Sequence, residues 1–115
     1  MDIQSEERGG TLVISLTGSL DTLTAGPAQS YIGAQFDGGQ HQIVLDLDQV
    51  DFISSSGLRL LVNMLKRSHD VGGGFCLASV RPDIRRTLEI SGLERILDIY
   101  RSVEEAVGSF ALPGS

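Results

Sequence analysis

The rest of this chain is arranged around one stretch, Asp51-Phe52-Ile53-Ser54-Ser55-Ser56-Gly57-Leu58-Arg59-Leu60-Leu61. An apolar run from Ile43 to Leu47 precedes it and predicts a buried strand, and leucines spaced as in an amphipathic helix follow it. Three consecutive hydroxyls and a glycine therefore stand in a turn that ends at a helix N-terminus. Serine oxygens accept hydrogen bonds from the unpaired amides of a first helical turn, and the same amides and the helix dipole favour a phosphate. The serines can serve as helix caps or as an anion-bearing site.

The composition predicts one soluble globular domain. The chain has 115 residues, 41% hydrophobic and 21% charged, which suffices for one core but not for two domains. The formal net charge of −6 disfavours nucleic acid and anionic membrane surfaces as partners. The N-terminal residues do not resemble a signal peptide, and no apolar run approaches the roughly 20 residues that span a bilayer. We therefore expect a cytoplasmic protein.

The remaining patterns predict strands that alternate with helices. Strands are expected at 3–8, 11–17, 41–47, 75–79 and 97–100, with a loop at 18–22. Helices are expected at 25–36, 56–69, 82–91 and 103–110, with a frayed tail at 112–115. The order β-β-α-β-α-β-α-β-α predicts an α/β fold: a mixed, mostly parallel sheet with an N-terminal hairpin and packed helices.

No set of side chains points to catalysis, a cofactor or a metal. His41 and His69 are separated by a strand, a turn and a helix, which is not a metal-ligand spacing. Ser55 does not stand in a nucleophile elbow, because Ile53 occupies the position of the first glycine. The serine turn lacks the lysine and the glycines of a P-loop. The lone Cys76 lies in an apolar run, which is typical of a small buried side chain.

The span from Asp46 to Leu61, with its core Asp-Phe-Ile-Ser-Ser-Ser-Gly-Leu, resembles the signature of STAS-domain proteins, the anti-sigma factor antagonists. The loop of that family reads Asp-Ser-Ser-Gly or Asp-Ser-Thr-Gly ahead of an apolar helix. Gly18-Ser19-Leu20-Asp21 is similar to the family's loop after its second strand. The segment from Arg81-Pro82 to Leu93 is similar to its proline-opened helix closed by Gly-Leu. The resemblance implies a single STAS domain over residues 1–115.

The resemblance also implies a function. Such a protein binds an anti-sigma factor that is also a serine kinase, frees the sigma factor, and is released when its serine is phosphorylated. Aligned on Gly57, that serine is Ser55, and Ser54 replaces the family's aspartate. Without the resemblance, the residues favour helix capping alone. The residues expected to contact the partner are Asp21, Ser54, Ser55, Ser56, Gly57, Arg59, Leu60 and Met64.

The helix after the serine turn has apolar residues on two sides. Its inward stripe is expected to consist of Leu58, Leu61, Val62 and Leu65. Leu60 and Met64 then fall on nearly the opposite side. There they either contact a protein partner or are covered by a neighbouring helix. Arg59, four residues after Ser55, is placed to pair with a phosphate on that serine.

Two other functions stay open. One is a STAS scaffold or transporter-associated module that binds a partner without a phosphate cycle, which the serine in place of the aspartate favours. The other is a small nucleotide-binding module that uses the serine turn. Under the main interpretation the protein is no enzyme, needs no cofactor, and is a monomer or a weak dimer.

Overall fold

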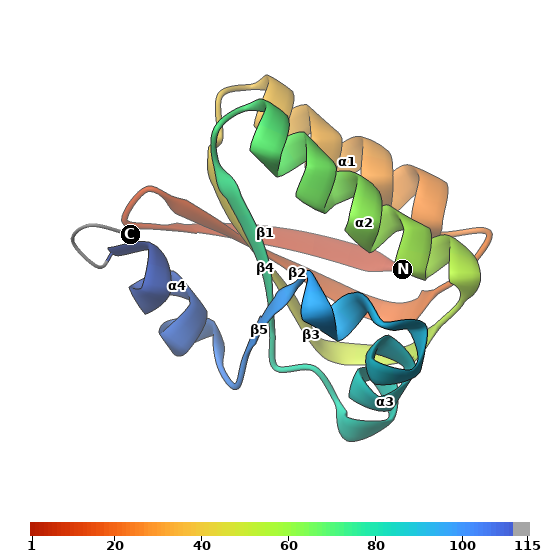
Figure 1. Ribbon diagram of the computed structural model, residues 1–115. Helices are drawn as coiled ribbons and strands as arrows, with labels where there is room; N and C mark the ends of the chain where they lie inside the picture. Colours follow the sequence, from red (N-terminus) through yellow and green to blue (C-terminus); the bar gives the residue numbers. More distant parts are fainter. Residues whose placement is uncertain (112–115) are drawn as a thin grey trace.

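Within residues 1–111, which the computed structural model describes, five strands and four α-helices alternate along the chain (Figure 1). The strands are β1 (Asp2–Arg8), β2 (Thr11–Leu20), β3 (Gln42–Ile53), β4 (Gly74–Ala78) and β5 (Asp98–Tyr100). The helices are α1 (Ala25–Asp37), α2 (Ser55–Asp70), α3 (Pro82–Ser91) and α4 (Val103–Ala111), with a 3-10 segment η1 (Leu93–Arg95). The element order is the predicted one, and only η1 was unforeseen. The predicted frayed tail at 112–115 lies outside the described residues.

The five strands form one sheet in the order β1-β2-β3-β4-β5. β1 pairs antiparallel with β2, and each of the other neighbouring pairs is parallel. Gly9 and Gly10 join β1 to β2 with φ angles of 55° and 87°, the positive values that a tight hairpin turn requires. The predicted α/β class, with a mostly parallel sheet and an N-terminal hairpin, is confirmed.

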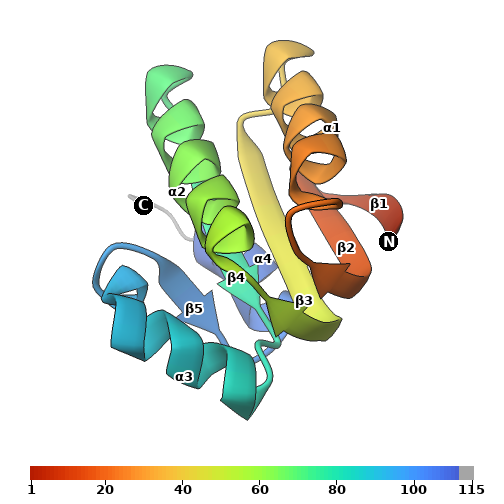
Figure 2. The same cartoon turned by 90° about the vertical axis from the view of Figure 1, so that its right-hand side faces the viewer.

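Helices cover both faces of the sheet. α1, α2 and α3 bury their apolar side chains in one large core with alternate residues of the strands. α4 packs on the opposite face against a small cluster centred on Val13, Val44 and Cys76. Figure 2 shows α1 and α2 side by side, with α3 apart from them near the ends of β3 and β4. In residues 1–111 no helix has the length and apolar character needed to cross a membrane.

Two strands are longer than predicted, and the loop expected at 18–22 is wrong for its first three residues. β2 continues through Gly18 to Leu20, and β3 continues through Val50 to Ile53. The extensions pair with each other across two register shifts, so that Leu20 lies opposite Ile53. Only some residues of the two extensions are buried, so their sequences lack the regular apolar pattern from which strands are predicted. The serine turn is therefore shorter than expected and begins at Ser54.

The inward face of α2 also differs from the prediction. Leu60 and Met64 are 0% and 5% exposed, so of the two alternatives given for them the second holds: a neighbouring helix covers them. Of the predicted inward stripe, Leu61 is fully buried, whereas Leu58, Val62 and Leu65 are half-buried. The reason is α1, which packs beside α2 over this side. Their contact includes a 3.2 Å hydrogen bond from the Asn63 amide to the Gln29 side chain.

The ends of α3 and α4 follow the sequence signals. Pro82 is the first residue of α3, and Gly92 ends it in the left-handed conformation at φ 80°. The Ser102 hydroxyl accepts a 3.1 Å hydrogen bond from the Glu105 amide and so caps the start of α4. Cys76 is buried, as expected from its apolar neighbours.

Candidate functional site

Ser54 is the N-cap of α2. Its backbone is extended, with φ −95° and ψ 177°, while the next residue is already helical. Its Oγ accepts a hydrogen bond from the Gly57 amide at 3.4 Å, and its own amide donates to the Leu20 carbonyl at 2.9 Å. The first bond satisfies one unpaired amide of the helix, and the second ties the turn to the end of β2. Ser54 thus supplies the cap that the neighbouring serines would otherwise have to provide.

The three hydroxyls of the turn have different surroundings. Ser54 is half-buried and occupied by its capping bond. Ser56 is half-buried too, and its hydroxyl lies 3.4 Å from that of Thr22 on the preceding loop. Ser55 is exposed, and within residues 1–111 its side chain makes no hydrogen bond. Ser55 is therefore the hydroxyl that an outside enzyme can reach most easily.

Gly57 allows α2 to start directly against the end of β2. A Cβ atom at this position would lie 2.7 Å from Ile53 Cγ1 and 2.8 Å from the Leu20 carbonyl oxygen. Both distances are too short for a real contact, so a larger residue would push the serine turn away from the sheet. Gly57 is itself buried, and it sets the position of the turn.

The loop that connects β2 to α1 lies beside the serine turn. The Asp21 carboxylate accepts hydrogen bonds from the amides of Leu23 at 2.9 Å and Thr24 at 3.1 Å. The Thr24 hydroxyl donates to the Ser19 carbonyl at 2.7 Å. These bonds fix the loop, so the role of Asp21 is to hold its shape. Leu23 projects from the fixed loop and is 85% exposed.

Leu23 was missed by the sequence reasoning, although a signal for it exists. It stands between Asp21 and Thr24, residues of types whose side chains bond to nearby backbone and hold a turn. An apolar residue in such a turn has no helical or strand periodicity that would carry it into the core. The Thr22–Ser56 contact brings this loop to the start of α2, and we call Asp21, Leu23, Ser55, Ser56 and Arg59, the residues of the loop and of that first part of the helix, the serine patch. Arg59 is exposed one turn beyond Ser55.

The chemistry available at the serine patch is that of two hydroxyls, one carboxylate, one guanidinium and one apolar side chain. Within residues 1–111, no three His, Cys, Asp or Glu side chains gather as a metal ion would need. The two histidines lie elsewhere: His69 is in the last turn of α2, and His41 just precedes β3. The patch is suited to accept a covalent phosphate on Ser55 and to contact another protein.

The fold and the turn match one known family. The sequence profile of the STAS domain family matches residues 2–106. This span includes every strand and reaches into α4. The chain therefore belongs to the STAS domain family.

Individual relatives share both sequence and fold. The candidate anti-sigma factor antagonist BtrV of Bordetella bronchiseptica is 34% identical over 115 residues, which is 98% of this chain and 99% of BtrV. A crystal structure of a candidate anti-sigma factor antagonist from Thermotoga maritima superposes with a TM-score of 0.89 at 26% identity, covering 93% of this chain and 92% of that one. The Bacillus cell fate determinant SpoIIAA in its phosphorylated form superposes with a TM-score of 0.74 at 26% identity, covering 95% and 99%.

Proposed function

We propose that this protein is an anti-sigma factor antagonist that binds an anti-sigma factor with serine kinase activity and is released when Ser55 is phosphorylated. The relatives named as anti-sigma factor antagonists support the general role. The phosphorylated form of SpoIIAA supports a phosphate cycle. In this proposal the protein binds its partner and catalyses nothing itself.

The observation that carries the proposal is that the three serines of the turn have different roles: one caps the helix and another is exposed and unbonded within residues 1–111. The oxygen of a serine that caps a helix is already engaged by a backbone amide, so its modification would disturb that hydrogen bond. Ser54 has that task, so Ser55 is free for modification without loss of the helix start. A phosphate at Ser55 would also sit on the first turn of α2, where the helix dipole favours negative charge. The modification therefore leaves the fold intact.

The switch acts on the partner. A phosphate adds about −1.5 to −2 charges and three acceptor oxygens in the middle of the serine patch. A partner that packs on Leu23 and the serine turn would have to desolvate this dianion, and each ~1.4 kcal/mol of penalty weakens binding tenfold. Leu60 and Met64 have no part in this contact, because they are buried under α1.

The first experiment tests the site of modification. The purified protein is incubated with ATP and an anti-sigma factor kinase encoded beside its gene, and phosphate is mapped by mass spectrometry. We expect modification of Ser55 and none of Ser54. Phosphate on another residue, with Ser55 untouched, would refute the assignment.

The second experiment tests the switch. Ser55→Ala should bind the kinase as the wild type does, while Ser55→Asp should raise the Kd by about tenfold or more. Ser30→Asp, which adds the same charge at an exposed position of α1, is the matched control and should leave the Kd unchanged. Thermal unfolding must show that Ser55→Asp is folded. Equal binding by Ser55→Ala and Ser55→Asp would point to a STAS module without a phosphate cycle.

A further inference from the structure

The outer side of α3 forms a groove that the serine patch does not use. The groove has a volume of about 590 Å³ and is lined by Val80, Pro82, Arg85, Arg86, Glu89 and Ile90. Its volume falls within the range of roughly 300–1,000 Å³ that is usual for ligand sites. The opposite side of α3 is committed to the core through Ile84 and Leu88. The groove therefore runs along the face of α3 that no other described element covers.

Helical spacing brings the groove residues into one stripe. Pro82, Arg86 and Ile90 follow one another at intervals of four residues and so lie on the same side of α3. Ile90 is 79% exposed, which leaves an aliphatic side chain next to a guanidinium in solvent. A partner that fills such a stripe must offer an apolar group beside a negative one.

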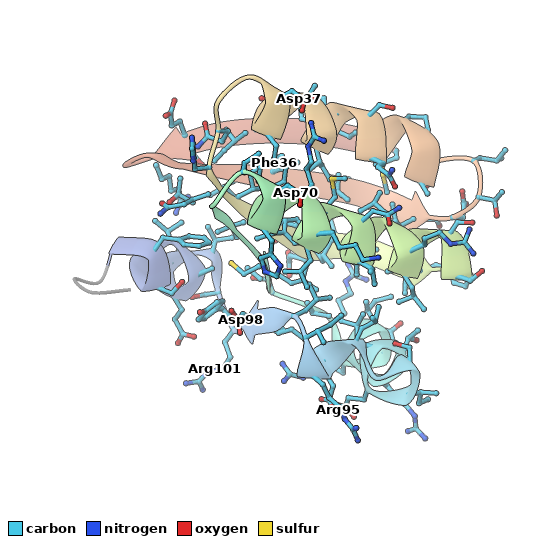
Figure 3. The ribbon with its side chains drawn as sticks, turned by 45° about the horizontal axis from the view of Figure 1, so that its top comes forward. Phe36, Asp37, Asp70, Arg95, Asp98 and Arg101 are labelled. Atoms are coloured by element: carbon cyan, nitrogen blue, oxygen red, sulfur yellow. The ribbon has the colours of Figure 1, made fainter. Side chains whose placement is uncertain are left out.

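The charge of this region differs from that of the rest of the chain. Residues 80–97 hold four arginines and three carboxylates, whereas the remaining residues hold five cations and twelve carboxylates. Arg85 pairs with Glu89 at 3.8 Å, while within residues 1–111 Arg86 has no ion-pair partner. Arg81 donates to the Asp48 carbonyl at 2.7 Å and meets no carboxylate in the described residues. Arg95 projects outward from η1, next to α3 (Figure 3).

We propose that the α3 groove binds a short acidic segment of a protein partner, with an apolar side chain seated on Ile90 and carboxylates paired with Arg86. This site is separate from the serine patch and does not rest on the function proposed above. The surface outside residues 80–97 carries an excess of carboxylates, which would repel any part of an acidic ligand that reached beyond the groove, so the ligand must be short. A nucleic acid or an anionic membrane extends beyond the groove and meets the carboxylates of the rest of the surface. Phosphate alone would leave Ile90 uncovered.

The probe is a synthetic peptide with two leucines set among aspartates and glutamates, titrated into the full chain. Binding is followed by the shifts of backbone amide signals in NMR spectra. We expect shifts in residues 80–90 and a Kd that rises with salt once the Debye length falls below ~10 Å. The same peptide with its carboxylates changed to amides, or its leucines to serines, should bind more weakly. No binding, or shifts centred on another surface, would overturn the proposal.

Arg86→Glu should raise the Kd of the peptide by about tenfold, because it places like charges opposite each other. Arg101→Glu is the matched control, since its side chain is 90% exposed and lies apart from α3 (Figure 3). It changes the net charge by the same amount and should leave the Kd unchanged. An equal loss of peptide affinity in both variants would show that only the net charge matters, and would overturn the proposed site. Phosphatidylglycerol vesicles or a short oligonucleotide could also bind as tightly as the peptide does. That result would show that the groove binds anions in general, and it would overturn the proposal of an acidic peptide segment.

Discussion

Serine and aspartate are close to interchangeable as helix N-caps, because each offers an oxygen to the amides of the first turn. The family's aspartate is replaced here by Ser54, and Ser54 accepts the capping bond from Gly57. The substitution therefore preserves the start of α2 and removes only a negative charge from the turn. Loss of that charge changes the electrostatics of the turn, while Ser55 stands on the first turn of α2.

Substitution of Ser54 tests this division of work. Ser54→Ala should lower the free energy of unfolding by about 1 kcal/mol, because an amide of the first turn loses its partner. Ser54→Asp should keep the stability of the wild type. Ser55→Ala is the control and should stay within about 0.5 kcal/mol, because Ser55 is exposed. Urea denaturation measures all three. A loss in Ser55→Ala equal to that in Ser54→Ala would show that the cap is shared.

At the scale of elements, helix α2 shows what the sequence could and could not determine. Its existence, its start at the serines and its C-terminal basic residues were predictable from local patterns. Its inward face was not, because apolar residues lie on both sides of it and periodicity alone cannot choose between them. The choice comes from α1, whose Asp37 forms an ion pair with Arg67 of α2 and whose Gln29 accepts a hydrogen bond from Asn63. Such contacts between helices are invisible in either segment taken alone.

The junction of α2 with β2 gives a prediction for a second residue. Gly57→Ala should lower the free energy of unfolding by about 1–3 kcal/mol, because the added methyl would lie 2.8 Å from the Leu20 carbonyl oxygen. Gly33→Ala in α1 is the matched control, since a Cβ there meets nothing within 4 Å. It should stabilise the protein by up to ~1 kcal/mol, as alanine favours a helix over glycine. Thermal or urea unfolding distinguishes the two. Equal stability of both variants would contradict the close packing at Gly57.

At the scale of the whole molecule, the segments named above gather at the carboxyl ends of the parallel strands, and α4 lies on the other face of the sheet. The parallel strands β2, β3 and β4 all end at one edge of the sheet, and each leads into a segment named above: the Asp21–Thr24 loop, the serine turn and α3. Open α/β sheets commonly place their binding sites beyond these carboxyl ends. α4 covers the opposite face and closes the small cluster around Cys76. Alternation of strands and helices predicted this layout, whereas the positions of the exposed Leu23 and Ile90 required the structure.

Cys76, which lies in the cluster under α4, should make the stability of the protein depend on pH. Burial, with a smaller contribution from the Asp98 carboxylate, raises the pKa of the Cys76 thiol from 9.0 to about 12. Above pH 9 the unfolded chain loses this proton while the native protein keeps it, so the free energy of unfolding should fall as the pH rises toward 12, by up to ~1.4 kcal/mol per pH unit. Below pH 9 the thiol is protonated in both states and has no such effect.

Cys76→Ala lacks this titration, and every other ionisable group is shared with the wild type. The variant should be less stable at neutral pH, because a buried side chain is shortened, but its stability should decline less steeply above pH 9. Urea denaturation at a series of pH values from neutral to strongly alkaline compares the two slopes. Parallel curves for the two proteins would mean that the thiol titrates alike in both states, and that α4 leaves it open to solvent.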